Sequence, residues 1–213
     1  KHYPPFPNDH NLSAFVVSDC RPYLRRWLEI CGENDLYMHE YIVDNVLQDG
    51  MAPPMPHLIR ADLRFYKEVG VRGVHPEMTS IYYWWPNCLT WYALFKLAWN
   101  VEADLEGLLD DYYQQCWGKA RAPIRMFFEE IEHIMPDWIA RVRQRWRRDL
   151  YSGGYPPSVL REEEEYHQQN LKRLRSCERH LKEAEELADD EAVLNRVRKA
   201  RLWLEYITKR MKS

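Results

Sequence analysis

The sequence predicts an α/β protein in which one strand, helix and parallel strand unit is followed by a mainly α-helical region. Two short stretches, Leu36–Tyr41 and Val71–His75, have the character of strands; each follows a helical pattern and ends near His or Glu rather than in turn residues. Beyond Asn100 the apolar residues recur at helical spacing. Polar side chains where strands end are typical of a β/α fold with a site at that edge.

The first helix is expected to begin at Pro22 and to end at Gly32, because proline suits a first turn and glycine a helix end. After the first strand, Gly50 and three prolines, of which Pro56 is the last, break regular structure and predict a long loop. A helix over Leu58–Val69 then leads to the second strand. Two strands joined by a helix should be parallel neighbours with a right-handed crossover.

The C-terminal region is predicted to consist of helices in three groups. Asn87 is the expected N-cap of an apolar, buried helix over Leu89–Trp99. Further helices are expected over residues 102–117 and 122–150, and a helical hairpin after the glycine- and proline-rich linker, with Asp189-Asp190 capping its second helix. We therefore divide the chain into a β/α part (1–100), packed helices (101–150), a linker (151–158) and a C-terminal helical hairpin (159–213).

Composition excludes several classes of function. The formal net charge of −3 over 213 residues offers no basic surplus for nucleic acid or an anionic membrane surface, and no apolar run reaches the length of a membrane span. The five cysteines have no metal-finger or redox spacing, and no phosphate loop, dinucleotide fingerprint or nucleophile elbow occurs. No metal and no cofactor is expected. The compartment and oligomeric state are not assigned; a secreted or periplasmic location is compatible with the composition.

Two glutamates, Glu40 and Glu77, are the candidate catalytic residues. Two carboxylates held at the mouth of a β/α barrel are what glycoside hydrolysis requires: one protonates the leaving oxygen, and the other acts as nucleophile or activates water. The structural alternative is a glutamate that bonds loop amides or an arginine. Because side chains alternate along a strand, His39 and Glu40 should face opposite sides, whereas His75 and Glu77 should share one.

Polar and aromatic residues near the strand ends are candidate sugar-binding residues. Histidine and amide side chains hydrogen-bond hydroxyl groups, and aromatic rings stack on sugar faces. The alternatives are packing histidines, ordinary turn residues and a hydrophobic plug. The candidates are His39, Tyr41, Asp44, Asn45, His75, Trp84 and Trp85.

Several stretches resemble a large bacterial family of unknown function whose members look like glycoside hydrolases related to α-glucuronidases. The resemblance covers about residues 21–131 and is carried by Tyr23–Ile30, Leu36–Tyr41, Pro54–Leu58, Asp62–Val74 and Leu97–Asp104. Two departures are His75-Pro76 after the second strand and a short segment before Arg21.

The resemblance implies that the chain is the C-terminal portion of a (β/α)8 (TIM) barrel, with the last βα units in residues 1–100 and helices after them. The remaining strands would belong to an N-terminal remainder of the same barrel, and the main acid/base residue could lie there. The expected activity is hydrolysis of glycosidic bonds in a polysaccharide or glycoconjugate. The alternatives are a non-catalytic carbohydrate-binding or scaffold module, and a helical interaction protein that uses residues 159–211.

Overall fold

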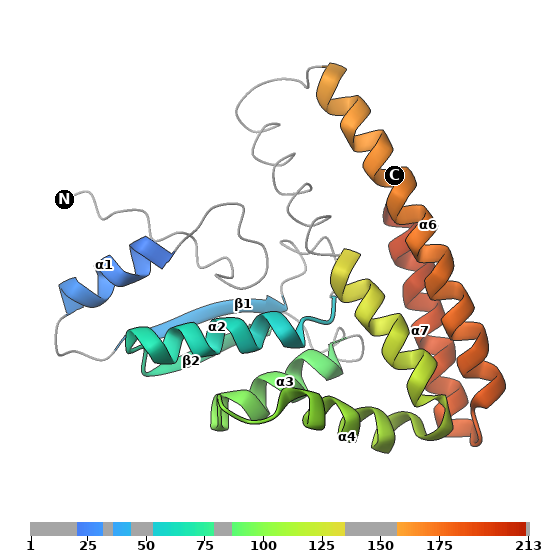
Figure 1. The fold of residues 1–213 in the computed structure, drawn as a ribbon, viewed down its shortest axis with the longest axis horizontal. Coiled ribbons are helices and arrows are strands. Elements are labelled where there is room, and N and C mark those ends of the chain that lie inside the picture. Colours follow the sequence, from blue (N-terminus) through green and yellow to red (C-terminus); the bar gives the residue numbers. More distant parts are fainter. Residues whose placement is uncertain (1–20, 32–35, 44–52, 79–86, 135–156, 212–213) are drawn as a thin grey trace. The chain divides into compact units, whose positions relative to one another are not determined.

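The computed structural model describes residues 21–31, 36–43, 53–78, 87–134 and 157–211 (Figure 1). The chain forms two compact units, Lys1–Leu108 and Leu109–Ser213. The described residues are mostly helical and contain one two-stranded parallel sheet. The α/β prediction is correct at this level, while the barrel stays a prediction.

The sheet is built by β1 (Tyr37–Val43) and β2 (Gly73–Met78), which pair in parallel. Both strands continue past the predicted ends, and a bulge interrupts the register between Glu40 and Val43. The prediction that the strands end at the polar residues was therefore wrong. Backbone pairing does not require apolar side chains, and β-branched Ile42 and Val43 favour an extended backbone.

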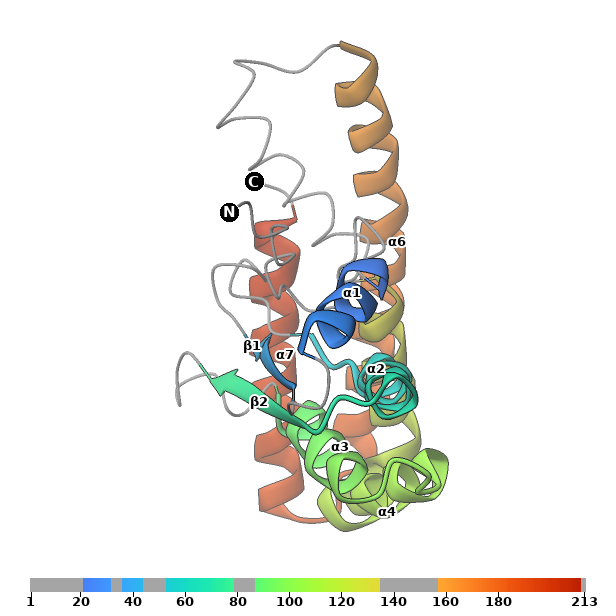
Figure 2. The same ribbon diagram turned by 90° about the vertical axis from the view of Figure 1, so that its left-hand side faces the viewer.

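Helix α2 (Pro56–Val69) connects the strands and packs with α3 (Cys88–Trp99). Figure 2 shows α1 (Arg21–Cys31), α2 and α3 lying together on one side of the two strands. Apolar residues of these elements form the core of the unit. They include Leu24, Met38, Ile59, Leu63, Tyr66, Leu89, Trp91, Leu94 and Leu97, all at most 8 % exposed.

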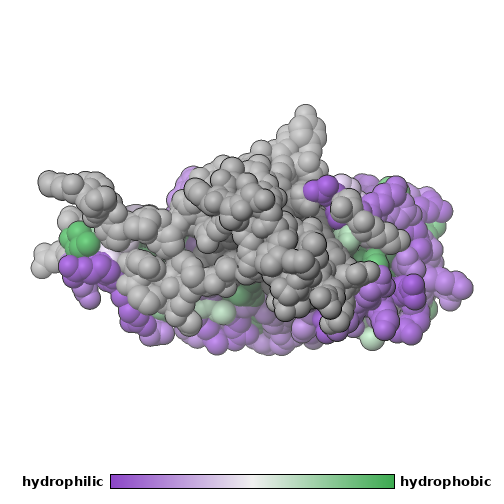
Figure 3. Space-filling view, turned by 90° about the horizontal axis from the view of Figure 1, so that it is seen from above, coloured by the Kyte–Doolittle hydropathy of each residue, from purple (hydrophilic) through white to green (hydrophobic). Residues whose placement is uncertain are grey.

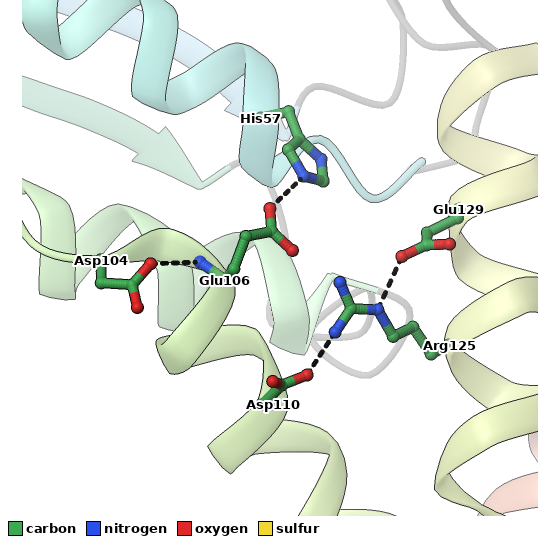
Figure 4. Close-up of polar contacts among 6 residues, drawn as sticks. All are labelled: His57, Asp104, Glu106, Asp110, Arg125 and Glu129. Atoms are coloured by element: carbon green, nitrogen blue, oxygen red, sulfur yellow. Dashed lines mark hydrogen bonds and ion pairs between the residues drawn. The ribbon is translucent and has the colours of Figure 1, made fainter.

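Two helix ends in this unit show ordinary capping chemistry. Gly70 ends α2 with φ of 93°, the left-handed conformation that glycine adopts without strain. Asp104 Oδ1 accepts a hydrogen bond from the Glu106 amide at the start of α4 (Leu105–Trp117), and Glu106 contacts His57 on α2 at 3.1 Å (Figure 4). Asn87 occupies the predicted N-cap position of α3, although its side chain makes no capping hydrogen bond.

Helix α3 differs from the prediction of a helix that is buried all round. Its first half is buried, but Phe95 is 55 % exposed and Trp99 is 93 % exposed. The apolar composition correctly predicted a helix, but it did not show which side of the helix a neighbouring element covers.

The second unit contains the end of α4, the short helix η2 (Gly118–Ala120), a helix over residues 121–134, α6 (Pro157–Leu187) and α7 (Glu191–Arg210). Arg125 bridges Asp110 of α4 and Glu129, the latter at 2.7 Å (Figure 4). Aromatic side chains pack against one another in its core, some pairs edge to face, a favourable ring geometry, and others tilted. They are Tyr113, Trp117, Phe127, Phe128 and Trp203.

Helices α6 and α7 form the predicted hairpin. The Asp190 carboxylate accepts a hydrogen bond from the Val193 amide at 2.7 Å, which confirms the predicted cap. Arg201 donates two hydrogen bonds to Glu185 across the hairpin, at 3.0 and 2.8 Å. Figure 3 shows that the visible surface of this hairpin is mainly hydrophilic, as expected of solvated outer helix faces.

Candidate functional site

The two faces of the sheet differ in their surroundings. Along β1, Met38 and Glu40 are 1 % and 2 % exposed, whereas Tyr37 and His39 are exposed. This alternation confirms the expectation that His39 and Glu40 face opposite sides of the sheet. We call the side of Tyr37 and His39 the open face, and the side of Met38 and Glu40 the helix face.

Glu40 lies on the helix face, against α2. Tyr66 of α2 donates a hydrogen bond from its hydroxyl group to Glu40 Oε1, and both side chains are buried. A narrow space beside this pair is lined by Leu63, Val74 and Leu94 among others. A buried carboxylate needs such a partner because water is excluded. The described partner of Glu40 is thus a tyrosine hydroxyl rather than the loop amides or arginine of the structural alternative, and the catalytic role of Glu40 stays a prediction.

His39 and His75 lie side by side on the open face. The two residues are register partners, and their Nδ1 atoms are 3.1 Å apart. The ring centres are 5.1 Å apart with an interplanar angle of 23°, so the rings turn their Nδ1 edges toward each other. A hydrogen bond between the two atoms requires one Nδ1 to carry a hydrogen and the other to offer a lone pair. The site residues that the structure brings together are thus two histidines.

Tyr37 extends this surface by one strand repeat and was not singled out from the sequence. Tyr37 is 62 % exposed, and its ring lies over Gly73, where an added Cβ would come within 2.9 Å of two ring carbons. Glycine at this position therefore makes room for the tyrosine ring. The period-two spacing of Tyr37 and His39 was the signal that could have found it.

The remaining predicted residues are described in part or not at all. Tyr41 and Glu77 lie within β1 and β2, and only their backbone is described. Asp44, Asn45, Trp84 and Trp85 lie outside the described residues.

Other features of the described residues do not converge on the histidine pair. A hollow of about 430 Å³ lies where β2 begins and is lined by Arg72, Gly73 and Trp99 among others. In a β/α barrel, residues at the end where the strands begin contribute to stability rather than to catalysis. Among the described residues, no three His, Cys, Asp or Glu side chains are grouped to hold a metal ion, and no helix has the length and apolar character to span a membrane.

The chain matches a known protein family. Residues 7–129, more than half of the chain, match the model described as a domain of unknown function (DUF4838). No curated protein and no solved structure matches the chain. The matched region includes both strands and the histidine pair.

Proposed function

The chain belongs to the DUF4838 family of domains of unknown function, and we propose that it is part of a carbohydrate-active enzyme that hydrolyses glycosidic bonds. In this proposal β1 and β2 are the last strands of a (β/α)8 barrel, the open face looks into the barrel, and the helix face is its outer layer. The observation that carries the proposal is the polar pair His39–His75 on the open face of two parallel strands.

The layering supports this assignment. In a β/α barrel, helices cover the outer face of every strand and the inner face carries the site. Here α2 and α3 adjoin one face, and the exposed polar and aromatic side chains lie on the other. A polar pair on the inner face is unusual for a packed barrel interior, where branched apolar residues dominate. The histidine pair therefore favours a functional site on this face over a purely structural role.

Glu77 is the carboxylate that we assign to catalysis. It follows His75 by two residues on β2, near the carboxyl end of the strand, where barrel enzymes carry their catalytic groups. Glycoside hydrolysis needs two carboxylates and no organic cofactor. The second one would come from another strand of the barrel, because the described contacts of Glu40 are those of a buried structural group.

The second candidate function is a carbohydrate-binding or scaffold module without catalysis. The observation that favours it is the burial of Glu40 at 2 % exposure with Tyr66 as its partner. Both functions would use the open face for sugar, so binding alone does not separate them.

Measuring turnover by variants of the protein distinguishes the enzyme from the non-catalytic module. Glycosidic bond cleavage would be measured with chromogenic glycosides and polysaccharides, together with sugar binding by calorimetry. We expect Glu77→Gln to lower turnover by about 100-fold or more while binding changes by less than about threefold. Glu68→Gln, at an exposed α2 position, is the matched control. Unchanged turnover in Glu77→Gln, or binding without any turnover in the unmodified protein, would favour the module.

A further inference from the structure

The ring of His75 has one hydrogen-bonded edge and one edge open to a ligand. Its Nδ1 meets Nδ1 of His39 at 3.1 Å, and among the described residues this is the hydrogen bond that its ring makes. His75 is exposed on the open face. The Nδ1 contact ties the orientation of the ring to His39 and leaves Nε2 for another partner, in the way that a second hydrogen bond fixes the working nitrogen of a histidine.

From this geometry we propose that His75 binds a hydroxyl group of a neutral sugar through Nε2 and that His39 is the positioning residue that orients it. The inference rests on the proposed carbohydrate function and adds the ligand group and the division of roles between the two histidines.

The shared Nδ1 hydrogen determines which ligand group fits. If His39 donates, His75 carries its hydrogen on Nε2 and is a donor to the ligand; if His75 donates, its Nε2 is an acceptor. A hydroxyl group both donates and accepts and so complements either form, whereas a carboxylate or an ammonium group complements one. A carboxylate accepts hydrogen bonds but donates none, so it lacks the donor that the second form requires.

Tyr37 supplies the second element of the surface. It stands two residues before His39 on the same face, a separation of about 6.6 Å along a strand. Its ring lies over Gly73, and the residue is 62 % exposed. An aromatic face beside a hydrogen-bonding group is the combination that binds sugars, because the apolar face of the sugar stacks while its hydroxyl groups bond.

The first test is nuclear magnetic resonance of the whole protein with ¹⁵N-labelled histidine rings. We expect His75 Nδ1 to show the chemical shift of a hydrogen-bonded nitrogen, and His39→Ala to abolish that signature. His39→Asn places an amide group near the position of Nδ1 and should restore the signature, whereas His39→Gln, whose amide lies near the position of Nε2, should not. This readout does not depend on turnover.

The second test is titration with xylo-, cello- and manno-oligosaccharides, with glutarate as an anionic control. We expect at least one neutral sugar to shift the His75 Nε2 signal and glutarate to leave it unchanged. Loss of the positioning contact in His39→Ala should weaken sugar binding about tenfold, the effect of one hydrogen bond, and His39→Asn should recover it to within about threefold.

The outcomes separate this inference from the proposed function. A hydrogen-bonded His75 that responds to sugar supports the inference even when no glycoside is cleaved. Cleavage that persists while all three sugar series leave His75 unshifted overturns the inference and leaves the enzyme assignment standing. Equal binding by His39→Ala and His39→Asn would refute the positioning role.

Discussion

The buried hydrogen bond from Tyr66 to Glu40 allows a sharp test of whether Glu40 is structural. Tyr66→Phe removes the hydroxyl donor and leaves the carboxylate, 2 % exposed, without that partner. A hydrogen bond to a charged group contributes about 1.5–3 kcal/mol, and both groups are buried, so solvent screening does not reduce the effect. We expect the local free energy of unfolding around β1 and α2 to fall by that amount. Glu40→Gln keeps an acceptor for the Tyr66 hydroxyl and should cost about 1 kcal/mol.

Native-state hydrogen exchange is the suitable assay because it reports each element separately. A loss of about 1.5–3 kcal/mol speeds exchange of the β1 and α2 amides by about 10- to 150-fold in Tyr66→Phe. The amides of α7 should exchange at unchanged rates. Tyr37→Phe is the matched control, because its hydroxyl lies on an exposed ring and its loss should change stability by less than about 0.5 kcal/mol.

Two results would refute this reasoning. Exchange of the β1 amides at the same rate in Tyr66→Phe and in the unmodified chain would mean that the bond contributes no stability. A loss of turnover in Glu40→Gln far larger than in Tyr66→Phe would assign Glu40 to chemistry rather than to the scaffold.

Three further predictions concern positions away from the open face. Gly70→Ala should lower the free energy of unfolding by about 1–2 kcal/mol, because φ is 93° at this position, and exchange of the α2 amides measures the loss. Gly70→Asn should lower it by less, and equal losses in the two variants would show that backbone strain is not the cause. Asp190→Ala should destabilise α7 by about 1 kcal/mol, measured by urea unfolding, because the helix loses its cap. The control Asp189→Ala loses only an exposed contact to Lys119 and should change stability by less than about 0.5 kcal/mol. Burial raises the pKa of the Cys177 thiol to about 12, so roughly one in ten thousand of these thiols is ionised at pH 8. Iodoacetamide should therefore label Cys177 only after the chain is unfolded in urea. Rapid labelling of the folded chain would contradict the burial of this thiol.

Local signals in the sequence located most of the elements. Glycine at the end of α2, the aspartates before α7 and helical periodicity all act within a few residues, so the sequence displays them directly. Pro56, predicted to belong to the preceding loop, instead begins α2, because proline is tolerated in a first helical turn. Alternation along β1 was equally local and correctly separated His39 from Glu40. Both strands extend beyond their predicted ends, because backbone pairing with the neighbouring strand rather than side-chain polarity sets where a strand ends.

The sequence by itself determined that a parallel strand pair joined by a helix carries His, Glu and aromatic residues near its ends. Only the tertiary structure decided that Glu40 turns to the helix face and bonds Tyr66, 26 positions later, while His39 meets His75, 36 positions later. The physical reason is that each of these contacts depends on the register of β1 with β2 and on the side that α2 covers. The register and the covered side are both set by packing between segments that are distant in the chain, so a local sequence pattern does not predict them.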